Sequence, residues 1–272
     1  MVIYHVYLRG IISKFTHHII HYLIIGTGIF LYPSISNYLA EKNQVEAIRN
    51  YDELVVNLDK ASLEEEKNKA KIYNENLSGD PVHDPFVQGS GYALPENYKE
   101  VLNFAGDGVM GYIDIPKISV YLPIYHGTSE EVLEKGVGDI FYIHVLDDVL
   151  TYKVLPILLG ANTVNMKKGA VHLTETSYPI GGENANSVIA AHRGYGKATM
   201  FRHIEKLEVG DEIFIRNFKE ELTYKVYEIK IINPDDIREL EIKSGEDIIT
   251  LITCHPYRVN NQRYIVKAQR AG

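Results

Sequence analysis

The chain has 272 residues, of which 45% are hydrophobic and 24% are charged, and its net charge at pH 7 is −8. These proportions are typical of a globular protein and exclude a wholly disordered, collagen-like or coiled-coil chain. The acidic balance excludes a nucleic-acid binder that works through a general basic surface. The single cysteine, Cys254, excludes an intramolecular disulfide. The sequence has no P-loop, dinucleotide fingerprint or convincing metal-ligand spacing, so we expect no cofactor and no metal.

The N-terminus carries an apolar run at residues 19–32, which Arg9 and Lys14 precede. Fourteen residues are short for a membrane span, but extension back to residue 10 gives 23. A buried core helix, a cleaved signal peptide and an uncleaved signal anchor are the three interpretations, and we favour an anchor within residues 1–33. Basic residues precede the run, and acidic residues follow it from Glu41 onward. This charge distribution predicts that the N-terminus lies inside the cell and the rest of the chain outside.

Residues 34–80 show a helical pattern and predict an amphipathic stalk. Val45, Ile48 and Val55 recur at helical spacing among polar residues. The pattern ends in a breaker cluster at residues 77–81. Residues 81–105 then form a linker that contains the triplet Asp84-Pro85-Phe86.

From residue 106 to residue 272 the pattern changes to short β-rich runs. The expected strands are 111–115, 120–125, 187–191, 212–217, 222–232, 248–254 and 263–268. Two short helices are expected between them, at 129–135 and 199–207. Many short strands with few helices favour a closed barrel or a sandwich.

One internal repeat is present. Residues 138–154 and 210–226 match at eight of 17 positions, including LTYKV in full. Each copy predicts a strand–turn–strand hairpin. Two copies indicate a local duplication, because repeat folds need three or more units.

Cys254 ends an apolar strand, and Pro256 stops that strand at once. A second run begins nine residues later with Arg263. If the two runs are neighbouring strands, the guanidinium stands beside the thiol, where it favours the thiolate and can hold a developing oxyanion. The alternatives are that Cys254 is a small buried hydrophobe and that Arg263 pairs with a surface acid.

His192 also lies at a strand end, after the apolar run 187–191. A histidine there can protonate a leaving amine and later deprotonate the incoming nucleophile. The chain has eleven histidines, and context alone selects one only weakly. His126 and His172 sit near glycines as further loop candidates.

These segments together resemble the sortase family. Residues 250–254, TLITC, resemble its TLxTC signature, with Arg263 at the family's arginine position, and residues 191–194, AHRG, resemble the segment with its histidine. Residues 108–116 and 122–127 look like the first barrel strands of class C, the pilus-assembling sortases, and Asp84-Pro85-Phe86 looks like that class's lid.

The resemblance implies a mainly β fold, a sortase-like closed eight-stranded β-barrel with short helices and an N-terminal helical stalk. It implies a cysteine transpeptidase that cuts the Thr–Gly bond of LPxTG-like sorting signals on pilin proteins and joins the acyl group to a pilin lysine amine. The implied catalytic residues are Cys254, His192 and Arg263, with Thr253 supporting the oxyanion or substrate.

In the implied lid, Asp84 pairs with Arg263 and Phe86 covers Cys254. The implied location is the cell membrane of a Gram-positive bacterium, with a single-pass anchor and the catalytic domain outside. Two other functions remain open: a cysteine hydrolase of the same fold, and a non-catalytic membrane-anchored surface protein.

The sequence departs from the class in two places near this chemistry. His255 follows the cysteine where the class often has Thr, which makes His255 a second candidate base. An extra segment at about 139–168 contains the first copy of the hairpin. We expect that copy either to form an additional outside hairpin or to compete with the second copy for its place in the barrel, which would spoil the site.

Overall fold

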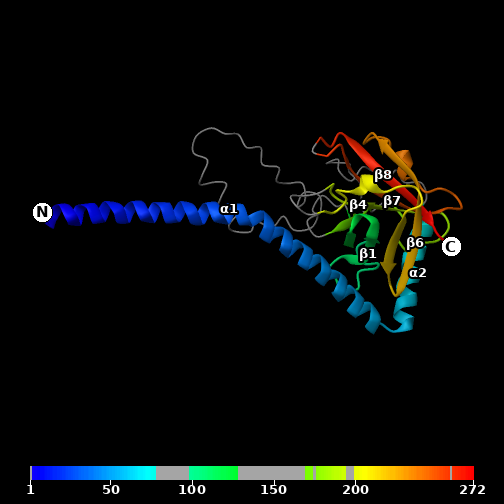
Figure 1. Ribbon diagram of the computed structural model, residues 1–272. Coiled ribbons are helices and arrows are strands. Elements are labelled where there is room, and N and C mark those ends of the chain that lie inside the picture. Colours follow the sequence, from blue (N-terminus) through cyan, green and yellow to red (C-terminus); the bar gives the residue numbers. More distant parts are fainter. Residues whose placement is uncertain (1, 78–97, 128–168, 174–175, 194–198, 258) are drawn as a thin grey trace.

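The computed structural model describes residues 2–77, 98–127, 169–173, 176–193, 199–257 and 259–272 (Figure 1). Two helices come first, α1 (Val2–Asn57) and α2 (Lys60–Asn76), and the β-rich domain follows them. Asp59 caps α2, because its carboxylate accepts a hydrogen bond from the Ser62 amide at 2.8 Å.

Eight strands close into a barrel in the order β1-β2-β3-β4-β7-β8-β6-β5, which confirms the predicted fold. The strands are β1 (Val109–Ile115), β2 (Val120–His126), β3 (Ala170–His172), β4 (Ala185–Ala190), β5 (Glu212–Asn217), β6 (Glu220–Ile232), β7 (Asp247–His255) and β8 (Gln262–Arg270). Among the described residues, three short 3-10 helices lie between the strands: η1 (Pro116–Ile118), η2 (Ile204–Lys206) and η3 (Ile237–Leu240). Most neighbours are antiparallel, but β2–β3 and β4–β7 run parallel.

Strand β7 is buried on both faces. Ile249 and Leu251 belong to the main barrel core, whereas Ile252 packs in a second cluster with Val188 and Leu240. Side chains alternate between the faces of a strand, so the second cluster lies on the outer face of the barrel. A strand covered on both faces reads as a continuous apolar run, which explains the sequence ITLIT before the cysteine.

Helix α1 braces the barrel at the β1 side. Ile48, Tyr51 and Val55 of α1 pack against Val109 and Tyr112 of β1. The buried Tyr51 hydroxyl donates to the Met110 carbonyl at 3.2 Å and accepts from the Phe218 amide at 2.9 Å. The expectation of a stalk that leans on the domain therefore holds for the C-terminal part of α1.

The N-terminal part of α1 extends away from the barrel in Figure 1, and several of its large apolar side chains are exposed. These are Ile20, Tyr22, Leu23, Ile24, Ile25, Ile29, Phe30, Leu31 and Tyr32. No helix in the described part of the chain offers a segment that is both long and apolar enough to cross a membrane.

The structure departs from the predicted elements at two described places. Strand β3 was not predicted, because three residues are too few to show an alternating pattern. The helix expected at 199–207 is a run of turns that ends in η2. The helix expected at 129–135 lies outside the described residues.

The second copy of the duplicated hairpin forms β5 and the start of β6, and β5 closes the barrel against β1. The first copy, together with the rest of segment 139–168, lies outside the described residues. The eight-stranded barrel is thus complete with the second copy in place.

Candidate active site

Cys254 and Arg263 are direct partners in the β7–β8 ladder. The antiparallel register pairs Ile252 with Ile265 and Cys254 with Arg263. Paired residues point to the same face of a sheet, and their strands lie about 4.8 Å apart. The structure therefore places the guanidinium-bearing residue beside the thiol, as the nine-residue spacing predicted. Cys254, the single cysteine of the chain, is half-buried.

The parallel β4–β7 pairing brings the histidine segment to the other side of the cysteine. Its register pairs Ala190 with Ile252, and the ladder continues with a hydrogen bond from the Ala191 amide to the Ile252 carbonyl at 3.3 Å. His192 and Cys254 lie two residues beyond the Ala190–Ile252 pair on their respective strands. The order across the three strand ends is therefore His192, Cys254, Arg263.

His192 sits in a protected position at the end of β4. Its carbonyl accepts a hydrogen bond from the Phe201 amide at 3.1 Å, which fixes the backbone there. Burial lowers the pKa of His192 from 6.5 to about 4, because the imidazolium loses its hydration. The neutral imidazole is favoured at pH 7, so His192 is ready to accept a proton.

The guanidinium of Arg263 is held from the chain connecting β7 to β8. The residue is 4% exposed, and its Nη1 donates to the carbonyls of Asn260 and Gln262 at 3.0 and 2.9 Å. Two carbonyl acceptors fix the plane of the guanidinium. A fixed, water-shielded cation is the kind of group that stabilises a developing oxyanion.

Thr253 supports the site in a different way from the one expected. It is fully buried, and its hydroxyl donates to the Ala191 carbonyl at 2.7 Å. Its side chain points to the opposite face from that of Cys254, because neighbouring strand residues alternate. Thr253 therefore ties β7 to the end of β4, and its hydroxyl does not face a substrate at the thiol.

His255 lies on the same opposite face, where its Nδ1 contacts Nη1 of Arg193. That placement separates it from the face that carries Cys254 and argues against its use as the base. Asp84 and Phe86, the residues of the expected lid, lie outside the described residues.

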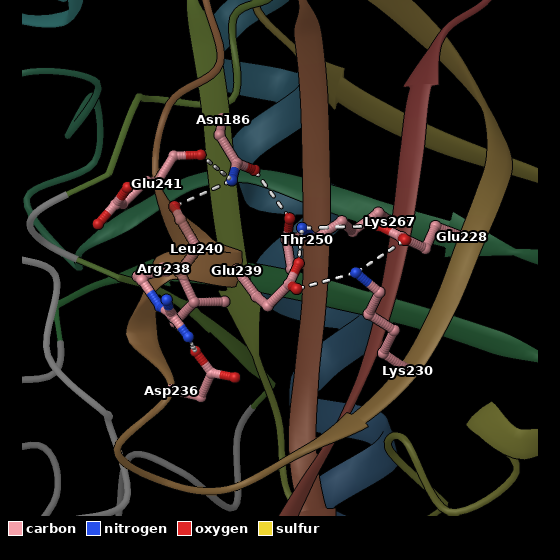
Figure 2. A network of polar contacts seen from close by, with 10 residues as sticks. All are labelled: Asn186, Glu228, Lys230, Asp236, Arg238, Glu239, Leu240, Glu241, Thr250 and Lys267. Atoms are coloured by element: carbon pink, nitrogen blue, oxygen red, sulfur yellow. Dashed lines mark hydrogen bonds and ion pairs between the residues drawn. The ribbon is translucent and has the colours of Figure 1, made fainter.

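The outer face that carries Cys254 continues into a polar network beneath η3 (Figure 2). Asn186 of β4 donates through Nδ2 to the carbonyls of Leu240 and Glu241, at 2.9 and 3.2 Å. Its Oδ1 accepts from the hydroxyl of Thr250, which lies on β7, at 2.9 Å. Asn186 thereby fastens the end of η3 onto the two strands that lead to His192 and Cys254.

A buried lysine anchors the same connection from β8. Lys267 pairs with Thr250 in the ladder and its side chain is only 2% exposed. Its Nζ lies 2.5 Å from Glu239 and 3.7 Å from Glu228, and Lys230 also reaches Glu239, at 2.8 Å (Figure 2). The two lysines, Lys230 first and Lys267 second, lower the pKa of Glu239 to about 2.

Sequence reasoning missed Lys267, Glu239 and Arg193 as supports of the site. Lys267 stands in an apolar strand, at an outer-face position four pairs along the ladder from Arg263. A lysine inside a run such as YIVKA is a signal for a buried cation with an acidic partner, but the sequence does not name that partner.

Comparison with known proteins agrees with this geometry. A family model described as the sortase domain matches residues 143–271. Sortase D of Bacillus subtilis is 29% identical over 163 residues, which are 59% of this chain and 63% of that protein. The chain thus aligns with less than two thirds of that relative's length.

Solved structures match over a larger share. Sortase C of Streptococcus pneumoniae superposes with a TM-score of 0.65 and 31% identity, covering 84% of this chain and 97% of that one. Sortase C-1 of Actinomyces oris gives a TM-score of 0.59 and 31% identity, covering 77% and 99%. With the barrel, the row of three strand ends and these matches, the chain belongs to the sortase family, and its structural relatives are class C members of that family.

Proposed function

We propose that this protein is a cysteine transpeptidase that cleaves the Thr–Gly bond of LPxTG-like sorting signals and joins the acyl group to a lysine amine of a pilin. The observation that carries the proposal is the row of His192, Cys254 and Arg263 across three adjacent strand ends. Pilin substrate specificity has been described for the sortase C of Streptococcus pneumoniae, which supports the choice of substrate.

In the first step, Cys254 Sγ bonds to the threonine carbonyl carbon, and the bond from that carbon to the glycine nitrogen breaks. Neutral His192 takes the thiol proton and delivers it to the leaving amine. Its lowered pKa keeps the imidazole free of its proton at neutral pH before substrate arrives. Arg263 stabilises the oxyanion that forms between the two bond changes.

In the second step, the lysine amine bonds to the thioester carbon, and the carbon–sulfur bond breaks. His192 takes a proton from the attacking amine and returns it to the sulfur. The products are an isopeptide and the free thiol of Cys254. In a hydrolase of the same fold, water replaces the amine in this step.

The test is mass spectrometry of the purified full chain mixed with an LPxTG-type peptide, with and without a primary amine. We expect a peptide-acyl adduct on Cys254, and an amide product when the amine is present. Cys254→Ala is expected to give neither species.

Product that partitions to water even at high amine concentration would replace transpeptidation with hydrolysis. A folded chain whose Cys254 reacts with a small alkylating agent but never with the peptide would contradict the proposed substrate.

We propose further that the N-terminal part of α1 holds the enzyme at the cell membrane, with the barrel on the extracellular face. Residues 15–40 contain no Asp, Glu, Lys or Arg. Apolar side chains there, such as Leu23, Ile24 and Phe30, are exposed to at least 63%. Such a run of exposed apolar side chains favours a lipid environment.

We expect the full chain to sediment with membranes and the variant without residues 1–33 to remain in the supernatant. The truncated variant keeps the part of α1 that packs on β1, so its thermal unfolding serves as the control for folding. Equal partitioning of the two proteins would contradict anchoring through this segment.

A further inference from the structure

Behind the catalytic row lies a second row on the opposite face of the same strand ends. Arg193 follows His192, and His255 follows Cys254. If the β4–β7 register is continued beyond Ala190 and Ile252, Arg193 and His255 become partners. The observed contact between Arg193 Nη1 and His255 Nδ1 agrees with that register.

Arg193 is buried, and its guanidinium contacts three different elements. Its side chain is only 6% exposed. Nη2 forms an ion pair with Glu205 of η2, and Nη1 contacts His255 at the end of β7. The guanidinium carbon lies 5.6 Å from the ring centroid of Tyr264 on β8, within the range of a cation–π interaction.

We propose that Arg193 is a positioning residue that ties the strand end carrying His192 to the strand end carrying Cys254 and places a second positive charge behind the thiol. A guanidinium can only donate, so the Nδ1 of His255 accepts and the imidazole is neutral in this contact. The histidine that departs from the class pattern thus supplies the acceptor for Arg193.

The electrostatics are consistent with a charge that reaches the thiolate. Burial lowers the pKa of Arg193, and the anionic forms of Tyr264 and Cys254 oppose that shift. The coupling between two charges is mutual, so the cation that is stabilised by an anionic Cys254 also stabilises the thiolate. For His255, burial first and the Arg193 charge second lower the pKa, which keeps its ring neutral at pH 7.

Alkylation of Cys254 over a range of pH tests the inference, because its rate follows the thiolate fraction. The inference rests on the proposed role of Cys254 as nucleophile, but alkylation needs no sorting peptide, so the two ideas fail separately. With Arg193→Gln, we expect the midpoint of the thiol titration to rise by about one pH unit, as for the loss of a nearby opposite charge. Acylation by the peptide is expected to fall in kcat by about tenfold with KM little changed.

A matched control is Arg216→Gln on β5, which removes the same charge from an ion pair with Glu221 far along the barrel. It is expected to leave the titration midpoint unchanged. Arg193→Lys keeps the charge but lacks the fork that reaches both Glu205 and His255. It is therefore expected to leave the thiol titration midpoint close to that of the parent chain and to lower kcat.

The His255 contact is tested with two further variants. His255→Asn keeps an acceptor and is expected to preserve kcat, whereas His255→Leu removes the acceptor and is expected to lower it. If Arg193→Gln fails to fold, Arg193→Lys and the two His255 variants carry the test. The inference is overturned if every folded variant of Arg193 and His255 keeps kcat within twofold of the parent chain and leaves the pH midpoint of the thiol titration unchanged. It is also overturned if Arg216→Gln shifts that midpoint as much as Arg193→Gln does.

Discussion

Arg263→Ala is expected to lower the rate of thioester formation by about 10²–10³-fold, which is the typical loss when one donor to an oxyanion is removed. The structure gives the reason. Arg263 is the ladder partner of Cys254, is almost fully shielded from water, and is fixed by the carbonyls of Asn260, before β8, and Gln262, at the start of β8. Because this donor is already in place and shielded from water, it does not have to reorganise when negative charge develops on the oxyanion.

Arg263→Lys is expected to recover little of that loss. A lysine ammonium is a compact charge on a flexible stem and cannot bind the carbonyls of Asn260 and Gln262 while it also reaches an oxyanion in a fixed plane. The comparison of the two variants separates the geometry of the guanidinium from its charge.

The measurement is single-turnover formation of the acyl adduct on Cys254, followed by mass spectrometry. Reaction of the same variants with a small uncharged alkylating agent reports whether the thiol remains accessible in a folded protein. Arg216→Ala on β5 is the control for loss of a cation from the barrel. Acylation by Arg263→Ala within threefold of the parent chain would remove Arg263 from the mechanism.

Two of the three residues of the catalytic row could be predicted to be neighbours from local sequence, and the third could not. Cys254 and Arg263 lie at the facing ends of two runs only nine residues apart, and an antiparallel hairpin is the natural connection over that distance. His192 reaches Cys254 through the parallel β4–β7 pairing, which joins residues 62 positions apart. No periodicity reports such a pairing, so the strand-end context selected His192 only weakly among the histidines, and the resemblance singled it out.

The same limit applies to the supports of the site. The alternation of side-chain direction along β7 assigns each residue to one of two faces, but it does not indicate which face η3 covers. Thr253 was expected to support the oxyanion or the substrate, but the sequence did not indicate that its hydroxyl bonds to the Ala191 carbonyl at the end of β4. Strand β3 and the buried position of Lys267 likewise depend on contacts between distant segments, and the fold supplies them only when the barrel has closed.

The second large effect concerns stability. Glu239→Gln is expected to lower the free energy of unfolding by about 3 kcal/mol, because it leaves the Lys267 ammonium buried without its nearest counter-charge. Glu228 remains, but at 3.7 Å it lies too far to replace the 2.5 Å contact. Lys267→Met fills the same space without a charge, so it is expected to lower the free energy of unfolding by less than Glu239→Gln does. The double variant is expected to be more stable than the sum of the two single losses predicts.

Denaturant unfolding of the two single variants and the double variant measures this coupling. Lys117→Met and Glu208→Gln form a matched cycle at an exposed ion pair, where coupling is expected to be close to the experimental error. Equal stability of Glu239→Gln and the parent chain would show that Lys267 is hydrated and that the network does not hold η3.

Acidification provides an independent check on the same pair. The pKa of Glu239 is lowered from 4.5 to about 2 in the folded chain, so its contribution to stability is complete above pH 4.5 and is lost as the pH falls toward 2. The parent chain is therefore expected to lose stability across that window more steeply than Glu239→Gln. Because η3 covers the outer face that leads to Cys254, Glu239→Gln is also expected to raise KM for the peptide at neutral pH. Parallel loss of stability in both proteins from pH 4.5 to pH 2 would show that the charge on Glu239 does not fasten this connection to the barrel.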